Sequence, residues 1–314
     1  MSSPTRGPGP ASARELEARL GRAGYLADPI TALSTWLALQ MKRPLLVEGP
    51  AGVGKTDLAR AAALALGRPL IRLQCYEGLD EAKALYEWDY AKQMLYTQLL
   101  RDVIARQVSG STGIADAARV VSASEAAFFS EQFLLARPLL LALKSPTPAV
   151  LLIDEVDRAE PEFEAFLLEI LSELQVTIPE LGTIKADPDN PPLVFLTTNG
   201  TREMTEALRR RCLHAFIDYP PPSREIAILK LRVPGIEQTL AEKVVTFVAL
   251  LRALDLRKAP AISETIDWAR AILLLGRSGL DRELVDGTLG LLLKHQGDKA
   301  DVLPKLDELL KASP

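Results

Sequence analysis

Short apolar runs alternate with stretches of helical periodicity over the first two thirds of the chain. Ahead of the first run, the spacing of Ser12 and Glu15 before apolar positions predicts a helix from about residue 12, and a second helix begins after Asp28 and Pro29. The second carries four large apolar residues at helical spacing: Ile30, Leu33, Leu37 and Met41. Five runs have the length and composition of buried strands: LLVE (45–48), PLIRLQ (69–74), AVLLID (149–154), PLVFLTTN (192–199) and HAFIDY (214–219).

Strands separated by helices predict a parallel sheet covered on both faces, so the expected fold class is α/β with five parallel strands. Two segments depart from this alternation. Residues from about 82 to 145 have a helical pattern, interrupted near SGSTG (109–113), and are far longer than a crossover needs, which predicts an insertion. The segment QVTIPELGTIKAD (175–187) has two β-prone pieces around PELG and predicts a hairpin.

After PPPS (220–223) the β-type runs cease, and helical patterns continue to the last residue. A chain of 314 residues is long enough for one large domain and a smaller one. We therefore expect a disordered tail over residues 1–11, an α/β core over residues 12–222 and a helical domain over residues 223–314.

The composition, with 48% hydrophobic and 25% charged residues, is typical of globular proteins, and a net charge of −4 gives no overall attraction to nucleic acid or anionic membranes. Cys75, Cys212, His214 and His295 are scattered and have no metal-binding or disulfide spacing. The start, MSSPTRGPGPAS, lacks the apolar region of a signal peptide, and no apolar run approaches the roughly 18 residues of a membrane span. The sequence thus predicts a cytoplasmic protein without a membrane span.

The stretch GPAGVGKT (49–56) follows a predicted strand and precedes a helical pattern, which is the context that a phosphate-binding P-loop requires. Its glycines let backbone N–H groups converge on phosphate oxygens at a helix N-terminus, where the helix dipole also favours negative charge. Lys55 is expected to reach the β- and γ-phosphates, and Thr56 to bind Mg²⁺. The candidate nucleotide-binding residues are Gly49, Pro50, Ala51, Gly52, Val53, Gly54, Lys55, Thr56 and Asp57.

Two carboxylates, Asp154 and Glu155, end the run AVLLIDE, so a buried strand delivers them to the sheet edge where open α/β folds bind ligands. Asp154 suits the metal ion and its waters, and Glu155 suits polarising the attacking water. A simple strand-to-helix turn is the alternative. Asn199 ends VFLTTN, where it either orients that water or touches the γ-phosphate, or only caps its strand.

Three consecutive arginines, residues 209–211, follow a predicted short helix, REMTEAL (202–208). Such a run is usually a solvated face, and a nucleic-acid patch is a further alternative. No other feature found in the sequence neutralises charge developing on a γ-phosphate, which favours an arginine supplied by a neighbouring chain. Arg211 is the first candidate and Arg210 the second.

The order of P-loop, LLIDE, TTN and RRRC, with a helical domain after the sheet, resembles the AAA+ ATPases. The long insertion and the hairpin before TTN resemble the helix-2-insert clade. Within it the MoxR family is similar at LIRLQCYEGLDEAKALYEWDY, DEVDRAEPEFEAFLLEILSE and VTIPELGTIKADPDNPPLVFLTTN. YEWDYAKQ and FFSEQFLLARPLLLAL (128–143) are similar to the branch associated with maturing the metal centre of carbon monoxide dehydrogenase. The resemblance runs from about residue 20 to near the end.

This resemblance implies a P-loop AAA+ core with an all-α lid domain, with Walker A at residues 49–56, Walker B at Asp154 and Glu155, sensor 1 at Asn199 and the arginine finger at Arg211. It also implies ATP and Mg²⁺ as cofactors. The partners it implies are further copies of the chain in a ring, most often a hexamer, a protein carrying a von Willebrand factor A domain, and a protein client that the ring remodels or matures, often for metal or cofactor insertion.

One position departs from the MoxR pattern, which usually has an arginine near the start of a lid helix as its second sensor. Ser263, Glu264 and Thr265 stand there instead, and Arg270 follows further along the same helix. A nucleotide-gated scaffold with little hydrolysis is therefore an alternative. A DNA-remodelling ATPase is another, since RRRC resembles a clamp-loader motif, although the charge balance does not favour nucleic acid as a partner.

Overall fold

The structure is a computed structural model that describes residues 9–109, 113, 119 and 128–313. Its centre is a five-stranded sheet with the order β2-β5-β8-β1-β9. Every neighbouring pair is parallel, so the predicted α/β class with five parallel strands is confirmed. The strands are β1 Leu45–Glu48, β2 Leu70–Gln74, β5 Val150–Asp154, β8 Leu193–Thr198 and β9 Leu213–Phe216.

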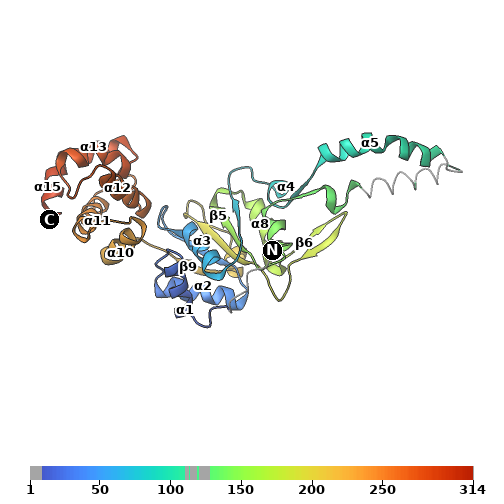
Figure 1. Cartoon of the computed structure of the whole chain (residues 1–314), viewed down its shortest axis with the longest axis horizontal. Helices are drawn as coiled ribbons and strands as arrows, with labels where there is room; N and C mark the ends of the chain where they lie inside the picture. The colour runs from blue at the N-terminus through green and yellow to red at the C-terminus, as the bar shows by residue number, and fades with distance from the viewer. Residues whose placement is uncertain (1–8, 110–112, 114–118, 120–127, 314) are drawn as a thin grey trace.

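Helices cover both faces of this sheet (Figure 1). Residues that alternate along a strand point to opposite faces: in β1, Leu45 and Val47 join one buried cluster and Leu46 joins another. The first cluster lies beneath α1 Ala13–Arg22, α2 Pro29–Met41 and α3 Lys55–Leu66, and the second beneath α7 Pro138–Leu143, α8 Pro161–Glu173 and α9 Glu206–Arg211. Burial on both faces explains why the central strands β1, β5 and β8 are largely apolar, whereas the edge strands β2 and β9 are partly exposed.

The first two helices begin where the sequence predicts. The Ser12 hydroxyl accepts a hydrogen bond from the Glu15 N–H at 3.2 Å, and α1 starts at the next residue. The Asp28 carboxylate accepts one from the Thr31 N–H at 2.7 Å, and α2 follows with Pro29 in its first position.

Three of the four large apolar residues singled out in α2 do not face the core, although Trp36 and Leu39 of the same helix pack against it. Ile30, Leu33 and Met41 are exposed, and α2 instead buries four small residues: Thr31, Ala32, Thr35 and Ala38. Small side chains let α2 pack closely on α1. The buried Thr35 hydroxyl donates to the Thr31 carbonyl oxygen at 2.8 Å, so its burial leaves no unpaired donor.

The insertion between β2 and β5 is not helical throughout, contrary to the sequence prediction. It contains α4 Glu81–Ala84, β3 Tyr86–Trp88, α5 Tyr90–Ser109, a 3-10 turn at Glu131–Phe133 and β4 Leu134–Ala136. Strands β3 and β4 form an antiparallel ribbon, and the Trp88 ring meets Phe129 edge to face at 5.1 Å. Three-residue strands are too short for alternation to be visible in the sequence. The described part of α5 reaches Ser109, and residues 110–112 of the predicted break lie outside the described residues.

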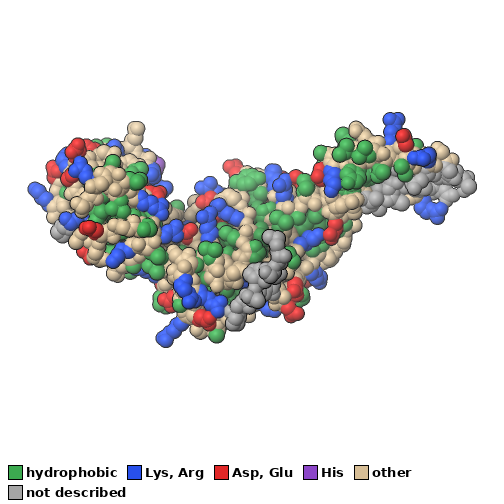
Figure 2. Space-filling view, viewed as in Figure 1, with side chains coloured by type: hydrophobic (Ala, Val, Ile, Leu, Met, Phe, Trp, Pro, Cys, Tyr) green, Lys and Arg blue, Asp and Glu red, His purple; other side chains and the backbone are tan. Residues whose placement is uncertain are grey.

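Helix α5 projects from the sheet as an arm, away from the C-terminal helices (Figure 1). At its base the Tyr96 ring meets Phe133 edge to face at 5.2 Å. Figure 2 shows hydrophobic side chains along the arm. The exposed ones are Tyr90, Met94, Leu95, Tyr96, Leu99, Leu100 and Val103.

The predicted hairpin over residues 175–187 is present as β6 Gln175–Ile178 and β7 Gly182–Lys185. The short helix predicted over residues 202–208 lies later in the chain, because the Thr205 hydroxyl accepts from the Leu208 N–H and starts α9 at Glu206. The three arginines therefore form the last turn of α9 rather than following a helix. Strand β9 stops at Phe216, three residues earlier than predicted, as the chain approaches Pro220.

The C-terminal helices, here called the lid, pack around a buried cluster of their own. In this cluster the rings of Phe247 and Trp268 lie 5.4 Å apart. The helices are α10 Pro222–Arg232, α11 Gln238–Arg252, α12 Ile262–Leu274, α13 Arg282–Leu292, α14 Gln296–Val302 and α15 Leu306–Lys311, with a 3-10 turn at Leu303–Lys305.

Most of the predicted tail, residues 1–8, lies outside the described residues. Its end is packed: Pro10 is buried, and its carbonyl oxygen accepts a hydrogen bond from Trp36 Nε1 at 3.0 Å. In the part of the chain that the structure describes, no helix has both the length and the apolar character needed to cross a membrane.

Candidate functional site

In the glycine-rich turn between β1 and α3, two of the three glycines with positive φ values also lack room for a Cβ. Gly49 and Gly52 have φ values of 152° and 76°. A Cβ at Gly49 would lie 2.0 Å from the Ile217 carbonyl oxygen, and one at Gly52 would lie 2.5 Å from the Ala261 Cβ. The turn is thus held between the chain that follows β9 and the start of lid helix α12.

Lys55, the first residue of α3, folds its amine back into this turn. Its Nζ donates to the carbonyl oxygens of Gly49 and Pro50, each at 2.7 Å, and to Asn199 Oδ1 at 2.8 Å. Burial lowers the pKa of Lys55. Three nearby carboxylates oppose that pKa shift: Asp157, Asp154 and Glu155. The site therefore holds a buried cation at the mouth of the turn, stabilised by acidic neighbours.

Asp154, at the end of β5, is 2% exposed and receives hydrogen bonds on both oxygens. Its Oδ1 accepts from the hydroxyls of Thr56 at 2.9 Å and Thr197 at 2.5 Å. Its Oδ2 accepts from Arg72 Nη2 at 2.6 Å. The sequence prediction assigned Asp154 and Thr56 to the same metal ion but did not include Arg72, which reaches Asp154 from the neighbouring strand β2.

Glu155 directs its carboxylate along the same edge of the sheet. Its φ of 55° is left-handed, and its backbone N–H donates to Thr197 Oγ1 at 2.8 Å. Its Oε2 accepts from Gln74 Nε2 and from Arg158 Nε, each at 3.0 Å. A non-glycine residue in this conformation stores strain that the surrounding contacts must hold, a feature common at functional sites.

Asp157 fixes the loop that carries Asn199. Its Oδ2 accepts from the backbone N–H groups of Asn199 at 3.2 Å and Thr201 at 3.0 Å, and from the Thr201 hydroxyl at 2.6 Å. Burial raises the pKa of Asp157, but these hydrogen bonds outweigh burial and hold that pKa below its ordinary value. The sequence analysis did not single out Asp157, although it lies only two residues beyond Glu155.

The structure thus brings Lys55, Thr56, Asp154, Glu155 and Asn199 together at the ends of three adjacent strands, β1, β5 and β8. Direct contacts join Lys55 to Asn199 and Thr56 to Asp154. Parallel strands end at the same edge, which is where ligands bind in open α/β sheets.

The two candidate arginines lie elsewhere, on the exposed side of α9. Arg211 Nε donates to Ser172 Oγ of α8 at 2.7 Å, and Arg210 pairs with Glu206 one turn earlier. The Arg43 guanidinium donates to the Arg210 carbonyl oxygen at 2.8 Å and to that of Arg211 at 3.2 Å, which caps the end of α9. The structure does not bring these two arginines to the cluster around Lys55 of the same chain.

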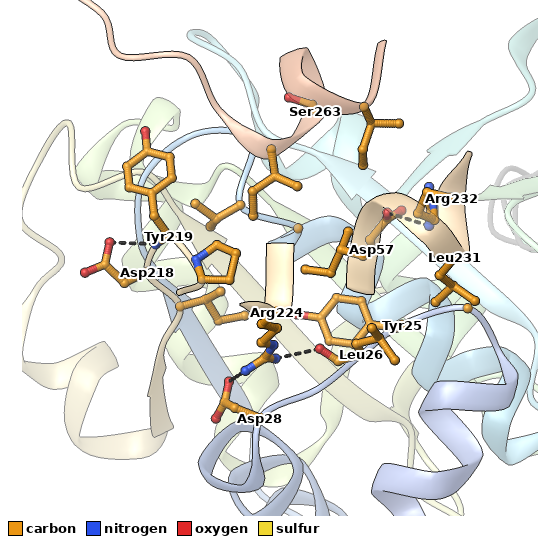
Figure 3. A pocket seen from close by; sticks show the side chains of 18 of the residues that line it. Tyr25, Leu26, Asp28, Asp57, Asp218, Tyr219, Arg224, Leu231, Arg232 and Ser263 are labelled. Carbon is orange, nitrogen blue, oxygen red and sulfur yellow. Dashed lines mark hydrogen bonds and ion pairs between the residues drawn. The ribbon is translucent and has the colours of Figure 1, made fainter. Parts of the chain in front are cut away.

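A cavity of about 400 Å³ lies between the core and the lid, beside the glycine-rich turn (Figure 3). Gly54, Asp57 and Tyr25 line it from the core, and Arg232 and Arg270 line it from the lid. Asp57, predicted as part of the nucleotide site, lies in the first turn of α3 and pairs with Arg232 at 3.2 Å.

The sheet order, the glycine-rich turn after β1, the carboxylates ending β5 and the helical C-terminal region define an AAA-type P-loop fold. The sequence profile of the AAA domain, dynein-related subfamily, matches residues 44–212. The chain belongs to this family.

Among known proteins, the chain is similar to the gas vesicle ATPase GvpN of Ancylobacter aquaticus, with 26% identity over 244 residues. That match covers 74% of this chain but only 61% of the relative, so the chain spans less than two thirds of that protein's length. An uncharacterised protein of Staphylococcus saprophyticus is 24% identical over 239 residues, 75% of this chain and 77% of its own length. A single-site variant of RuvB from Thermotoga maritima aligns over 95% of this chain and 76% of its own, with 14% identity and a TM-score of 0.44.

Proposed function

We propose that the chain is a Mg²⁺-dependent ATPase whose hydrolysis rearranges a protein client. The observation that carries this proposal is the pair of contacts that join the P-loop to the ends of β8 and β5, Lys55 to Asn199 and Thr56 to Asp154. The first contact joins the proposed phosphate-binding lysine to the amide that would hold the attacking water, and the second joins the two proposed ligands of the metal ion.

The residues at the turn fit a nucleotide with its metal ion. Gly49, Gly52 and Gly54 all have positive φ values, a backbone conformation in which the N–H groups of such a turn can converge on a phosphate. The buried amine of Lys55 supplies positive charge, and the oxygens of Thr56 and Asp154 are the hard ligands that Mg²⁺ prefers. Bound there, Mg²⁺ would neutralise charge on the phosphates.

In this proposal each residue at the strand ends has one task. When a nucleotide binds, the Lys55 amine donates its hydrogen bonds to phosphate oxygens in place of the carbonyl oxygens of Gly49 and Pro50. Glu155 accepts the proton of the attacking water, and Gln74 and Arg158 orient its carboxylate. Asn199 holds the water or the γ-phosphate, and Asp157 keeps the Asn199 loop in position.

Hydrolysis would also need positive charge on the γ-phosphate from the other side. The side chains of Arg211 and Arg210 are exposed on α9, and Arg43 binds the carbonyl oxygens of both residues. An exposed arginine on a fixed helix end is suited to reaching the site of a neighbouring copy. We therefore propose that copies of the chain form a ring, most simply a hexamer, with Arg211 as the arginine finger.

The division of the chain follows the same proposal: a core over residues 12–222, with the insertion at about 82–145 and the hairpin at about 175–187, and a lid over residues 223–314. The exposed apolar side chains of α5 suit contact with a protein client. Within the family, we assign the chain to the MoxR type and to the branch associated with carbon monoxide dehydrogenase maturation. A von Willebrand factor A protein is then the expected partner, and the cytoplasm, where ATP is supplied, the expected location.

A nucleotide-gated scaffold is the second candidate. The observation that favours it is the absence of an arginine among residues 263–265, where Ser263 and Glu264 hydrogen-bond to each other instead. A scaffold would bind ATP and assemble without turning it over. DNA remodelling has no comparable support, because the net charge is negative.

Steady-state ADP formation by the full chain tests the proposal. The wild type should turn over ATP only with Mg²⁺ present, and Lys55→Ala should remove turnover because the P-loop loses its buried cation. Lys305→Ala, which alters an exposed lysine of the lid, is the matched control and should behave as the wild type. Turnover that survives in Lys55→Ala would contradict the proposed site.

A further inference from the structure

The lid touches the P-loop through the first turn of α12, but without positive charge. A Cβ added at Gly52 would lie 2.7 Å from Ser263 Oγ, so the residues that replace the expected second-sensor arginine already abut the loop backbone. Neither Ser263 nor its neighbours Glu264 and Thr265 can attract a phosphate by charge. If the lid responds to phosphate, another lid residue must carry the positive charge.

Arg232 carries that charge to the edge of the P-loop helix. It is the last residue of α10, and its Nη1 lies 3.2 Å from Asp57 Oδ2. Asp57 follows Thr56 in the first turn of α3, and both Asp57 and Arg232 line the cavity between core and lid (Figure 3). The guanidinium therefore borders the helix N-terminus that is suited to an anion.

Arg270, the other arginine of the lid that lines the cavity, holds Arg232 in place and does not itself reach the core in this structure. Its Nη2 donates to the Arg232 carbonyl oxygen at 3.1 Å, and its Nη1 contacts Asp267 at 3.4 Å. Both contacts are with the lid itself. Arg270 thus fixes the end of α10, from which Arg232 extends to the core.

The electrostatics of the pair make it responsive to an anion. The positive end of the helix dipole attracts an acidic residue in the first turn, such as Asp57. The same negative charge repels a phosphate bound at that end of the helix. Arg232 offsets that repulsion, and the five donors of a guanidinium can serve a carboxylate and a phosphate together. Both side chains are 38% exposed, so the ion pair is weak enough to rearrange.

We propose that Arg232 is the lid residue that contacts the phosphates of a bound nucleotide, with Asp57 as its partner when no nucleotide is bound. Because Arg232 ends α10, a change of partner shifts the lid relative to the P-loop. This couples the lid to nucleotide without an arginine at residues 263–265. The inference rests on the proposed function, since it requires a nucleotide at the P-loop.

Binding of fluorescent methylanthraniloyl-ATP and methylanthraniloyl-ADP to the full chain tests the inference. Arg232→Ala should weaken both by about tenfold, the effect of losing a hydrogen bond to a charged group. Arg282→Ala is the matched control, because Arg282 pairs with Asp307 within the lid, and it should bind as the wild type. Arg270→Ala should cause a smaller loss.

The double variant Asp57→Asn/Arg232→Ala separates contact with phosphate from simple neutralisation of Asp57. Removing the Asp57 charge should restore only part of the lost affinity, because the contact to phosphate is still missing. Full recovery, or wild-type affinity in Arg232→Ala alone, would overturn the inference while leaving the ATPase proposal intact. A wild-type chain that binds neither nucleotide would instead overturn the proposed function.

Discussion

Glu155→Gln is expected to reduce steady-state ATP turnover by about a hundredfold or more, the usual contribution of a general base. The amide keeps the shape of the side chain and can still contact Gln74 and Arg158, but it cannot accept the proton of the attacking water. ATP binding should stay close to that of the wild type, because Lys55 and the glycine turn are unchanged. Coupled measurement of ADP formation, with methylanthraniloyl-ATP binding alongside, separates the two steps.

Glu162→Gln is the matched control for this variant. Glu162 is an exposed carboxylate in the first turn of α8, close in sequence to Glu155 but outside the site, and its variant should turn over ATP normally. Wild-type turnover in Glu155→Gln would show that another group activates the water. Loss of nucleotide binding in the same variant would mean that Glu155 maintains the shape of the site rather than the chemistry.

Arg211→Ala is expected to lower turnover by about a thousandfold, because an arginine finger stabilises the charge of the transition state. The structure places Arg211 on the exposed side of α9, bound to Ser172, so its effect on hydrolysis should operate between copies of the chain. The ATPase rate per chain of the wild type should rise with protein concentration. When Arg211→Ala is mixed with the wild type, the ATPase rate should fall faster than simple dilution predicts, because each variant copy disables the site of its neighbour.

Two further variants on α9 sharpen this test. Arg209→Ala removes an exposed arginine of the same turn and should be mild, whereas Arg210→Ala tests the second candidate. A rate per chain that is independent of concentration and follows simple dilution in the mixture would contradict a shared site. A strong loss confined to Arg210→Ala would move the finger by one residue but keep the ring.

Much of the sheet could be predicted from sequence because strands buried on both faces must be apolar throughout. Runs such as LLVE and AVLLID leave little choice of structure. The ribbon of Tyr86–Trp88 and Leu134–Ala136 could not be predicted, because three residues do not reveal a period of two. The buried face of α2 was also hidden, since close packing on α1 selects small residues over large apolar ones.

The candidate site also contains residues that a local sequence pattern predicts and residues that only the pairing of strands brings in. Lys55, Thr56 and Asp154 could be expected at one edge of the sheet because a P-loop and a strand-end carboxylate have recognisable local spacing. Gln74 reaches Glu155 only because β2 pairs with β5 in a register that sets Gln74 opposite Asp154. No local pattern encodes that register.

The lid contact is a still longer-range feature. Arg232 meets Asp57 across most of the chain, and each is ordinary in its own helix: a basic residue in a last turn and an acidic residue in a first turn. Only the packing of the lid against the core brings the two side chains together. The sequence could report the missing second-sensor arginine but not the residue nearest to replacing it.

The most direct test of the central claim, that the chain hydrolyses the ATP it binds at its P-loop, is a single-turnover measurement. Trace γ-labelled ATP would be mixed with excess full-length protein at a concentration that favours assembly, with Mg²⁺, and free phosphate followed over time. We predict that nearly all bound ATP is cleaved in the wild type and stays intact in Glu155→Gln. Bound ATP that remains uncleaved in the wild type would contradict the ATPase proposal and favour the nucleotide-gated scaffold.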